Sequence, residues 1–392
     1  MNYCFDKIIE RIGTNSQKWD SEQDYQKGKV IPMWVADMDF PVAEPIIKAI
    51  SKRLEHPIFG YAIKGDDFFS SVVRWMRKRH QWNVDNSWIV STPGVVPAIS
   101  FAIQAFTEPG DSVIIQTPVY YPFEATIKAC SRKTVINPLL FDGTHYKMDL
   151  DDFDNKVKQN HVKMFILCNP HNPVGRVYTY EELSKIGEIC LQNGIKIFSD
   201  EIHSDLIFSG YKHIPIASIS EELSNITLTG ISPSKSFNIA GLMTAVVICQ
   251  NDNLRRTFES VTIRNGVQFV NTFGREALKA AYTEGDEYLE QLLRYLEKNV
   301  EYAIDYFEKN LKPLKLVKPE GTYLLWVDCR ELRMSSAELD NFIYNQARLS
   351  FDDGRMFGEC GEGFTRINVA CSQTILEKAL NQLKGALDLL KN

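Results

Sequence analysis

Short apolar runs alternate with helical patterns through the middle of this 392-residue chain, and this alternation limits the possible folds more than any other feature. The run SWIVS (87–91) precedes a helical pattern, and KMFILCN (163–169) precedes another that ends before IKIFSDE (195–201). Strands that are apolar on both faces and separated by helices are typical of a mostly parallel sheet covered on both sides. The sequence therefore predicts a large α/β/α sheet domain.

The helix expected between the last two of these strands has recognisable ends. Thr179 and Glu182 have the spacing of a capping box, in which each side chain accepts a hydrogen bond from the other residue's backbone N–H. Gly194 is a typical stop signal just beyond a last helical turn. These signals predict a helix over 180–193.

The pattern changes near Asp286, where apolar residues begin to recur every three or four positions and predict a long amphipathic helix. A strand-like run at 321–328, a helix opening at Ser335 and a final helix from about Thr374 follow. This order is typical of a smaller α+β domain. The predicted parts are an N-terminal arm that packs with the small domain, a large domain and a small C-terminal domain, at 1–45, 46–285 and 286–392.

Charge, hydropathy and cysteine use argue against several classes of protein. The net charge of −6 does not favour binding to nucleic acid or to an anionic membrane. The N-terminus lacks the apolar core of a signal peptide, and the apolar run at 239–249 is too short to span a bilayer. The eight cysteines form no C-x-x-C pair and no Cys/His metal spacing. We expect a cytoplasmic protein with reduced thiols and without a bound metal, a nucleic-acid partner or membrane contact.

Polar residues follow four of the strand-like runs, and an open α/β sheet binds its ligands beyond the carboxyl ends of its strands. The four are Gly94 in TPGVVPA, Asn172 in CNPHNPVG, Asp200 in FSDEIH and Lys235 in SPSK. Each alone has an ordinary interpretation, as a turn, a structural group or a surface lysine. A lysine at the start of an apolar stretch is nevertheless unusual, because burying an unpaired ammonium group is costly.

Together these residues fit one cofactor, pyridoxal 5'-phosphate. A desolvated lysine can form a Schiff base with an aldehyde, and a buried aspartate can pair with a protonated ring nitrogen. Serines and the amides of a helix N-terminus suit a phosphate group. A dinucleotide-binding fold is the competing α/β interpretation, but no G-x-G-x-x-G follows any strand-like run.

The order and spacing of N-P-x-N-P-x-G, S-D-E-I-H and S-x-S-K resemble the fold-type I pyridoxal-phosphate enzymes, the class I/II aminotransferase superfamily. This resemblance covers nearly the whole chain and implies the aspartate aminotransferase-like fold of PLP-dependent transferases. More narrowly, the chain resembles the MalY/PatB-like cystathionine β-lyase branch. The stretches that carry this likeness include VADMDFPV (35–42), FGY (59–61), TPVYYPF (117–123), SPSKSFNIAGL (232–242) and GEGFTRINVAC (361–371).

The resemblance implies roles for the residues around the cofactor ring. Lys235 matches the lysine that binds the cofactor aldehyde and moves the substrate Cα proton, and Asp200 matches the partner of the pyridine nitrogen. Tyr120 matches the aromatic residue stacked on the ring, with Tyr121 as the alternative assignment, and completes the catalytic set. The residues implied near the ring 3'-oxygen are Asn172 and His203.

Further matches concern the phosphate, the substrate and a second subunit. The implied phosphate contacts are Gly94, Val95, Ser232 and Ser234. Tyr61 matches a tyrosine that reaches the phosphate from the neighbouring subunit, which implies a homodimer. Arg366 matches the arginine that pairs bidentately with the substrate α-carboxylate, and Asn172 is implied as a second substrate contact.

One departure from the wider superfamily bears on the reaction. Typical aminotransferases carry a phosphate-binding arginine where this chain has Met243. The resemblance therefore implies a PLP-dependent carbon–sulfur β-lyase that converts L-cystathionine or a related cysteine S-conjugate to a thiol, pyruvate and ammonia. A class I/II aminotransferase is the alternative enzyme, because it shares the first proton transfer. A PLP-loaded regulatory protein that binds a protein partner is the alternative of another class.

Overall fold

A seven-stranded sheet forms the larger part of the computed structural model, which describes residues 2–390. In spatial order its strands are β2 (Ile89–Thr92), β10 (Ala245–Ile248), β9 (Thr227–Ile231), β8 (Lys196–Asp200), β7 (Val162–Cys168), β3 (Ser112–Thr117) and β4 (Lys133–Pro138). Strand β10 is antiparallel to both neighbours, whereas the other adjacent pairs are parallel. The predicted mostly parallel sheet is confirmed.

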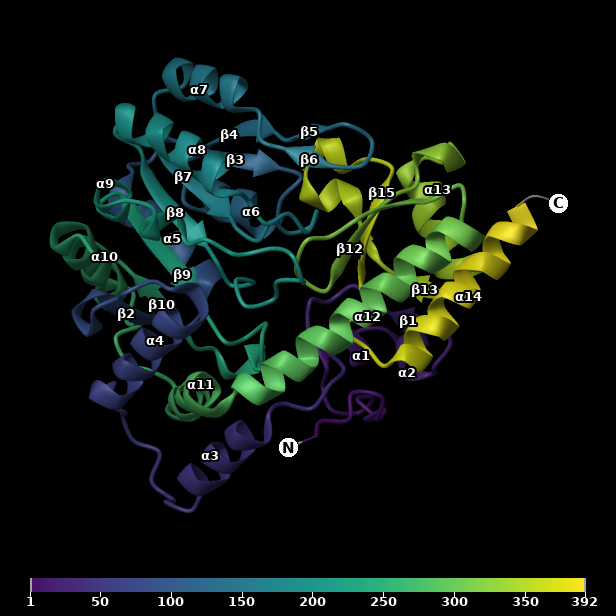
Figure 1. Ribbon diagram of the computed structural model, residues 1–392, viewed down its shortest axis with the longest axis horizontal. Coiled ribbons are helices and arrows are strands. Elements are labelled where there is room, and N and C mark those ends of the chain that lie inside the picture. The colour runs from purple at the N-terminus through teal and green to yellow at the C-terminus, as the bar shows by residue number, and fades with distance from the viewer. Residues whose placement is uncertain (1, 391–392) are drawn as a thin grey trace.

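Helices cover both faces of this sheet (Figure 1). One face packs against α5 (Val95–Phe106), α6 (Pro122–Ala129) and α10 (Asp252–Arg264). The other packs against α7 (Leu150–Gln159), α8 (Tyr180–Gln192) and α9 (Glu221–Ser224). Successive residues of β3 alternate between the two cores, since Val113 and Ile115 join the first and Ile114 the second. Helix α8 has the predicted Thr179/Glu182 capping box.

A second, four-stranded sheet is antiparallel and contains the C-terminal strands. Its order is β11 (Lys315–Val317), β12 (Leu324–Asp328), β15 (Phe364–Asn368) and β14 (Asp352–Asp353). Helices α13 (Ser336–Asn341) and α14 (Gln373–Leu390) lie beside it, and Ser335 forms a capping box with Glu338. The predicted long helix is α12 (Asp286–Asn310), which extends diagonally in Figure 1 to lie beside α14.

Helices α3 (Glu44–Leu54), α4 (Gly65–His80) and α11 (Thr272–Glu284) pack together below the large sheet in Figure 1. Their buried residues belong to one continuous core that also includes α12 and the small sheet. A short hairpin of β5 (Leu140–Phe141) and β6 (Tyr146–Lys147) completes the regular strands outside the two main sheets and the N-terminal pairing.

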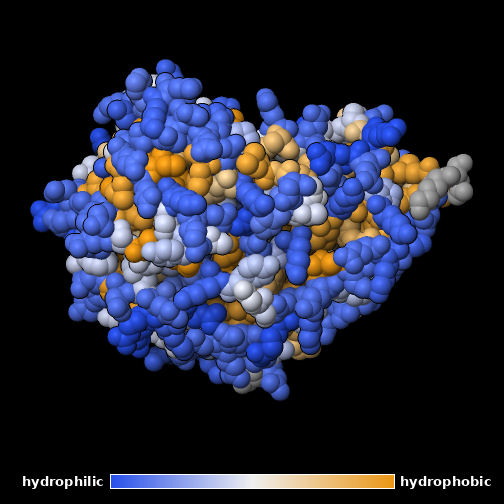
Figure 2. All heavy atoms as spheres, turned by 45° about the horizontal axis from the view of Figure 1, so that its top comes forward, coloured by the Kyte–Doolittle hydropathy of each residue, from blue (hydrophilic) through white to orange (hydrophobic). Residues whose placement is uncertain are grey.

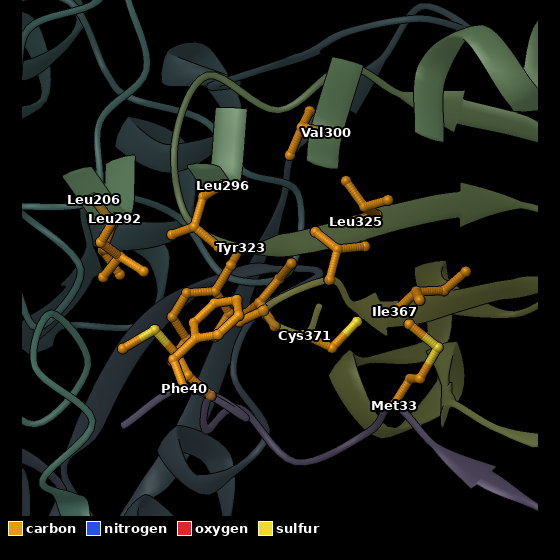
Figure 3. Packing of buried hydrophobic residues seen from close by; sticks show 14 of the residues in the cluster. Met33, Phe40, Leu206, Leu292, Leu296, Val300, Tyr323, Leu325, Ile367 and Cys371 are labelled. Carbon is orange, nitrogen blue, oxygen red and sulfur yellow. The ribbon is translucent and has the colours of Figure 1, made fainter. Parts of the chain in front are cut away.

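The N-terminal segment carries α1 (Gln17–Asp20) and α2 (Gln23–Gln26), and its β1 (Ile31–Pro32) pairs in parallel with β13 (Leu349–Ser350). Figure 3 shows Met33 and Phe40 of this segment packed among residues of α12, β12 and β15. The buried Lys18 ammonium donates to Asp39 at 2.8 Å, and Arg11 binds both Asp37 and Asp39. These contacts hold the segment 34–40 to the rest of the N-terminal region.

The face drawn in Figure 2 is mostly hydrophilic, with hydrophobic side chains gathered in separate patches between charged ones. Among residues 2–390, no helix has both the length and the apolar character needed to cross a bilayer.

Candidate active site

A pocket of about 250 Å³ lies at the carboxyl-terminal edge of the seven-stranded sheet. It collects turns that follow β2, β3, β7, β8 and β9, because the parallel direction of these strands brings their ends to one edge. The predicted residues that line it are Gly94, Val95, Tyr120, Asn172, Asp200, His203, Ser232, Ser234 and Lys235. The structure thus gathers most of the predicted site into one cavity.

Lys235 is the only described lysine among the residues that line this pocket. Its Nζ donates a hydrogen bond to the backbone oxygen of Ala36 at 2.7 Å. Burial and the nearby Arg366 charge lower the lysine pKa to about 8, although Asp37 and Asp200 act in the opposite direction. A pKa in this range leaves a substantial neutral fraction near pH 8, and the neutral amine is the form that acts as a nucleophile or base.

Asp200 is the last residue of β8 and is 4% exposed. Its Oδ1 accepts a hydrogen bond from the Ile202 N–H at 3.1 Å. Burial raises the pKa of this carboxyl to about 7, while the Ile202 N–H and the Lys235 charge lower it less. Within the described part of the chain, no cation lies within salt-bridge distance of Asp200. The pocket therefore contains a buried carboxylate that a cationic ligand would stabilise.

Tyr120 and His203 are the tyrosine and histidine among the residues that line the pocket. Tyr120 lines the pocket, and burial raises its pKa to about 12. Tyr121 is 38% exposed and packs edge-on against Phe357, so the geometry favours Tyr120 as the ring contact. Burial, followed by the Lys235 and Arg366 charges, lowers the pKa of His203 well below its ordinary value. The His203 Nδ1 is buried and has no hydrogen-bond partner in the described structure.

Neutral donors converge on one end of the pocket. Gly94 is the N-cap of α5, so the first N–H groups of this helix face the cavity. The hydroxyl oxygens of Ser232 and Ser234 lie 2.7 Å apart, and Ser232 Oγ also donates to the Thr244 carbonyl. Met243, in the left-handed conformation with φ of 48°, lines the same end. An anion bound here would contact a helix N-terminus and hydroxyls.

Arg366 extends from β15 toward Asn172, which connects it to the pocket. Its Nη1 donates to Asn172 Oδ1 at 3.0 Å, and its Nη2 donates to the Trp34 carbonyl at 2.9 Å. Nη2 also donates to the carboxylate of Asp352 on the neighbouring strand β14. The guanidinium lies over the Phe357 ring, 4.9 Å from its centroid.

Tyr61 does not reach the pocket within this chain. Its side chain is 87% exposed, and its ring lies 4.7 Å from that of Phe269, centroid to centroid, with the two planes tilted by 32°; Phe269 is also exposed. Phe59 and Ile63 beside it are exposed as well. An exposed apolar cluster of this kind is typical of a protein–protein contact.

The segment 34–40 is a part of the site whose contacts the motifs do not reveal. The Ala36 carbonyl accepts hydrogen bonds from both Lys235 and the Tyr323 hydroxyl. The side-chain amide of Asn368 donates to the carbonyls of Val35 and Asp37. Asp352 is a site residue that the motifs also miss, because only the pairing of β14 with β15 places it against Arg366. A backbone carbonyl can belong to any residue type, so the sequence does not predict these contacts. The VADMDFPV stretch was nevertheless part of the family resemblance.

The sequence matches a known protein family over most of its length. The model of the family "Aminotransferase class I and II" matches residues 29–383. The chain belongs to this family. It is 42% identical over 384 residues to cystathionine beta-lyase PatB of Bacillus subtilis, covering 98% of this chain and 99% of that protein.

Two solved structures are close in fold to this chain. Cystalysin from Treponema denticola, which contains pyridoxal 5'-phosphate, has a TM-score of 0.96 at 38% identity, with both chains fully covered. The PLP-bound C–S lyase from Staphylococcus hominis has a TM-score of 0.92 at 34% identity, covering 99% of this chain and 98% of that one. The predicted fold type I architecture is confirmed.

Proposed function

We propose that this protein is a PLP-dependent carbon–sulfur β-lyase, with L-cystathionine as the first substrate to test. The observation that carries the proposal is the placement of Lys235 and Asp200 in one pocket, where burial shifts the pKa of each toward neutrality. The likeness to PatB and to two C–S-cleaving or PLP-containing structures supports the same reaction class. Cysteine, cystine and other cysteine S-conjugates are the further substrates to test.

The pocket residues fit pyridoxal 5'-phosphate. Asp200 offers a buried carboxylate to a protonated ring nitrogen, and the unpartnered His203 Nδ1 and the Asn172 amide, which line the same pocket, would bind a ring oxygen. The α5 N-terminus with Ser232 and Ser234 would hold the phosphate. Met243 adds no charge there, so the phosphate would depend on neutral donors.

Lys235 is the residue that would move the reacting proton. Its Nζ would take the proton from the substrate Cα, and the Ala36 carbonyl would orient the amine while it does so. Pyridoxal phosphate supplies an electron-accepting ring that stabilises negative charge at Cα. The Asp200 carboxylate would keep a proton on the ring nitrogen, which strengthens this stabilisation.

Arg366 would bind the α-carboxylate of the substrate, and Asn172 fixes the orientation of its guanidinium. Tyr120 would pack on the face of the ring and exclude water from one side. The bond from Cβ to sulfur would then break as electrons move from Cα, and the sulfur would leave as a thiolate that takes up the proton Lys235 removed from Cα. The remaining carbon skeleton takes up water and gives pyruvate and ammonia.

We further propose a homodimer in the cytoplasm. The cluster of Phe59, Tyr61, Ile63 and Phe269 is exposed and apolar, and a second copy of the chain would cover it. Tyr61 of one copy would then reach the phosphate end of the other pocket. All eight cysteines are free thiols, which fits a reducing compartment.

A substrate assay tests the reaction class. Purified holoenzyme mixed with L-cystathionine, without any added keto acid, is expected to release homocysteine and pyruvate in equal amounts. Thiol and pyruvate are measured separately. Conversion of the cofactor to its amine form, reversed by a keto acid and without thiol release, would instead identify an aminotransferase. Absence of both, with tight cofactor binding, would favour a regulatory role.

A further inference from the structure

Most of the N–H groups of the Arg366 guanidinium are hydrogen-bonded to other residues of the chain. Of its five N–H groups, Nη2 uses both of its own on the Trp34 carbonyl and the Asp352 carboxylate. Nη1 uses one on Asn172. The Nε–H is buried and lacks a partner within residues 2–390.

A carboxylate binds a guanidinium bidentately through one of two pairs of nitrogens, Nη1 with Nη2 or Nε with Nη2. Nη2 belongs to both pairs, and both of its N–H groups are committed in this structure. An incoming α-carboxylate therefore cannot form a complete bidentate pair with Arg366 unless it displaces the Trp34 carbonyl or Asp352.

The two groups differ in how readily they can leave. The Trp34 carbonyl belongs to the segment 34–40, whose neighbouring carbonyls are held by Asn368. The Asp352 carboxylate can leave Arg366 by side-chain rotation, while its backbone stays paired opposite Arg366 in β14–β15. Asp352 also carries the same negative charge as the ligand. The two carboxylates would therefore repel each other if both bound the Arg366 guanidinium.

We propose that Asp352 is an internal competitor for Arg366, and that a substrate α-carboxylate binds only as Asp352 gives up this cation and takes up a proton from solvent. Substrate binding is then coupled to proton uptake at Asp352. Asp352 acts on the substrate through Arg366 and is a specificity-determining residue rather than a catalytic one. This inference rests on the proposed role of Arg366 in the lyase reaction.

The surroundings of Asp352 are compatible with this proton uptake. Burial raises the pKa of its carboxyl above the ordinary value, although the Arg366 charge and hydrogen bond lower it. The other titratable groups facing it are Tyr25 on α2 and Tyr120 and Tyr121 ahead of α6. Burial raises the pKa of each of these tyrosines, so they stay neutral while Asp352 titrates.

Calorimetry on the holoenzyme measures the proton uptake directly. The probe is methylthiopropanoate, a thioether carboxylate without an amino group, so the ligand itself does not titrate from about pH 6 to about pH 9. Binding enthalpies in buffers of different ionisation enthalpy give the protons taken up per ligand. We expect uptake in the wild type to exceed that in Asp352→Asn, and the difference is the contribution of Asp352. Equal uptake in both proteins would overturn the proposal.

Kinetics provide a second readout with a matched control. Asp352→Asn keeps an acceptor beside Arg366 but removes the competing charge, so we expect KM for L-cystathionine at about pH 8 to fall about tenfold, the equivalent of one pKa unit. The affinity advantage of the variant shrinks as pH falls, because Asp352 of the wild type then becomes neutral. Asp353→Asn is the control, since Asp353 pairs instead with Arg355 at the surface.

A rise in KM in Asp352→Asn would overturn the proposal, because it would mean that Asp352 positions Arg366 for the substrate. Asp352→Ser is the second variant if the amide variant does not fold, with the same expected direction. The lyase proposal is judged separately, by thiol and pyruvate release from the wild type. Probe binding without wild-type turnover would count against the lyase and leave the proton uptake measurable.

Discussion

At the scale of single residues, burial in the pocket disfavours the charged forms of Lys235 and Asp200. Burial lowers the pKa of Lys235 to about 8 and raises that of Asp200 to about 7. Each shift is costly to the free protein, because a charged group is held where water cannot solvate it. Such shifts are typical of groups that must exchange protons near neutral pH.

Replacing Lys235 with alanine is expected to lower turnover at least about a hundredfold, because it removes the base that takes the Cα proton. The visible absorbance of the lysine-bound cofactor is expected to disappear as well. Absorbance spectra and thiol release measure both effects. Lys185→Ala, at an exposed position on α8, is the control. A yellow, lysine-linked cofactor in Lys235→Ala would place the Schiff base elsewhere.

Replacing Asp200 with asparagine is expected to stabilise the cofactor-free protein. The folded-state pKa of about 7 lies above the ordinary 3.8, so the stability that Asp200 contributes is complete below about pH 4 and is lost as pH rises through 7. At about pH 8 the variant is expected to gain more than about 1 kcal/mol in unfolding free energy. Denaturant unfolding of both apoproteins at about pH 4.5 and 8 measures the difference. A variant less stable than wild type at pH 8 would show that Asp200 holds the apo fold together.

At the scale of elements, local signals determine helix ends, whereas tertiary pairing determines the small strands. The capping box of α8 was visible as Thr179 and Glu182, and the structure contains it. Glu182 additionally binds Arg176 at 2.7 Å, which connects this helix end to the turn after β7. The start of α8 is therefore stabilised both by its own capping box and by the contact with Arg176.

Removing the Thr179 side chain is expected to cost about 1 kcal/mol of unfolding free energy, because an N–H of the first turn of α8 loses its acceptor. Thr179→Ala is compared with Thr257→Ala on the exposed side of α10, where the hydroxyl only bonds back to a helix carbonyl. Denaturant unfolding of both variants gives the comparison. Equal losses would mean that the cap contributes nothing beyond an ordinary threonine.

The same contrast explains how much of the site the sequence predicts. Lys235, Asp200 and Asn172 follow long apolar strands, so strand pattern and motif together place them at one edge. Asp352 lies on a two-residue strand that exists only because β15 pairs with it, and no local pattern marks it. His80 ends a basic run at 74–80, yet it is buried, with its Nε2 3.0 Å from Asp205 Oδ1, a contact that no local pattern marks.

At the scale of the whole molecule, we propose from the exposed cluster around Tyr61 that a second copy of the chain completes the site. Sedimentation is expected to give about twice the chain mass of 44.8 kDa. Tyr61→Ala is expected to remain dimeric but to retain its cofactor less well, because a phosphate contact from the partner is lost. Gel filtration followed by cofactor absorbance separates the two effects. A monomer with full activity would contradict the shared site.

The pairing of β1 with β13 has a consequence for synthesis on the ribosome. Ile31 emerges early, but its partner Leu349 is made near the end of the chain. The Ala36 carbonyl and Arg366 are separated in the same way, so a nascent chain carries Lys235 for a long interval before its pocket closes. We expect ribosome-bound chains that end before residue 349 to leave the N-terminal arm open to protease and to capture no cofactor. Protection of the arm in such chains would show that it folds without its late partner.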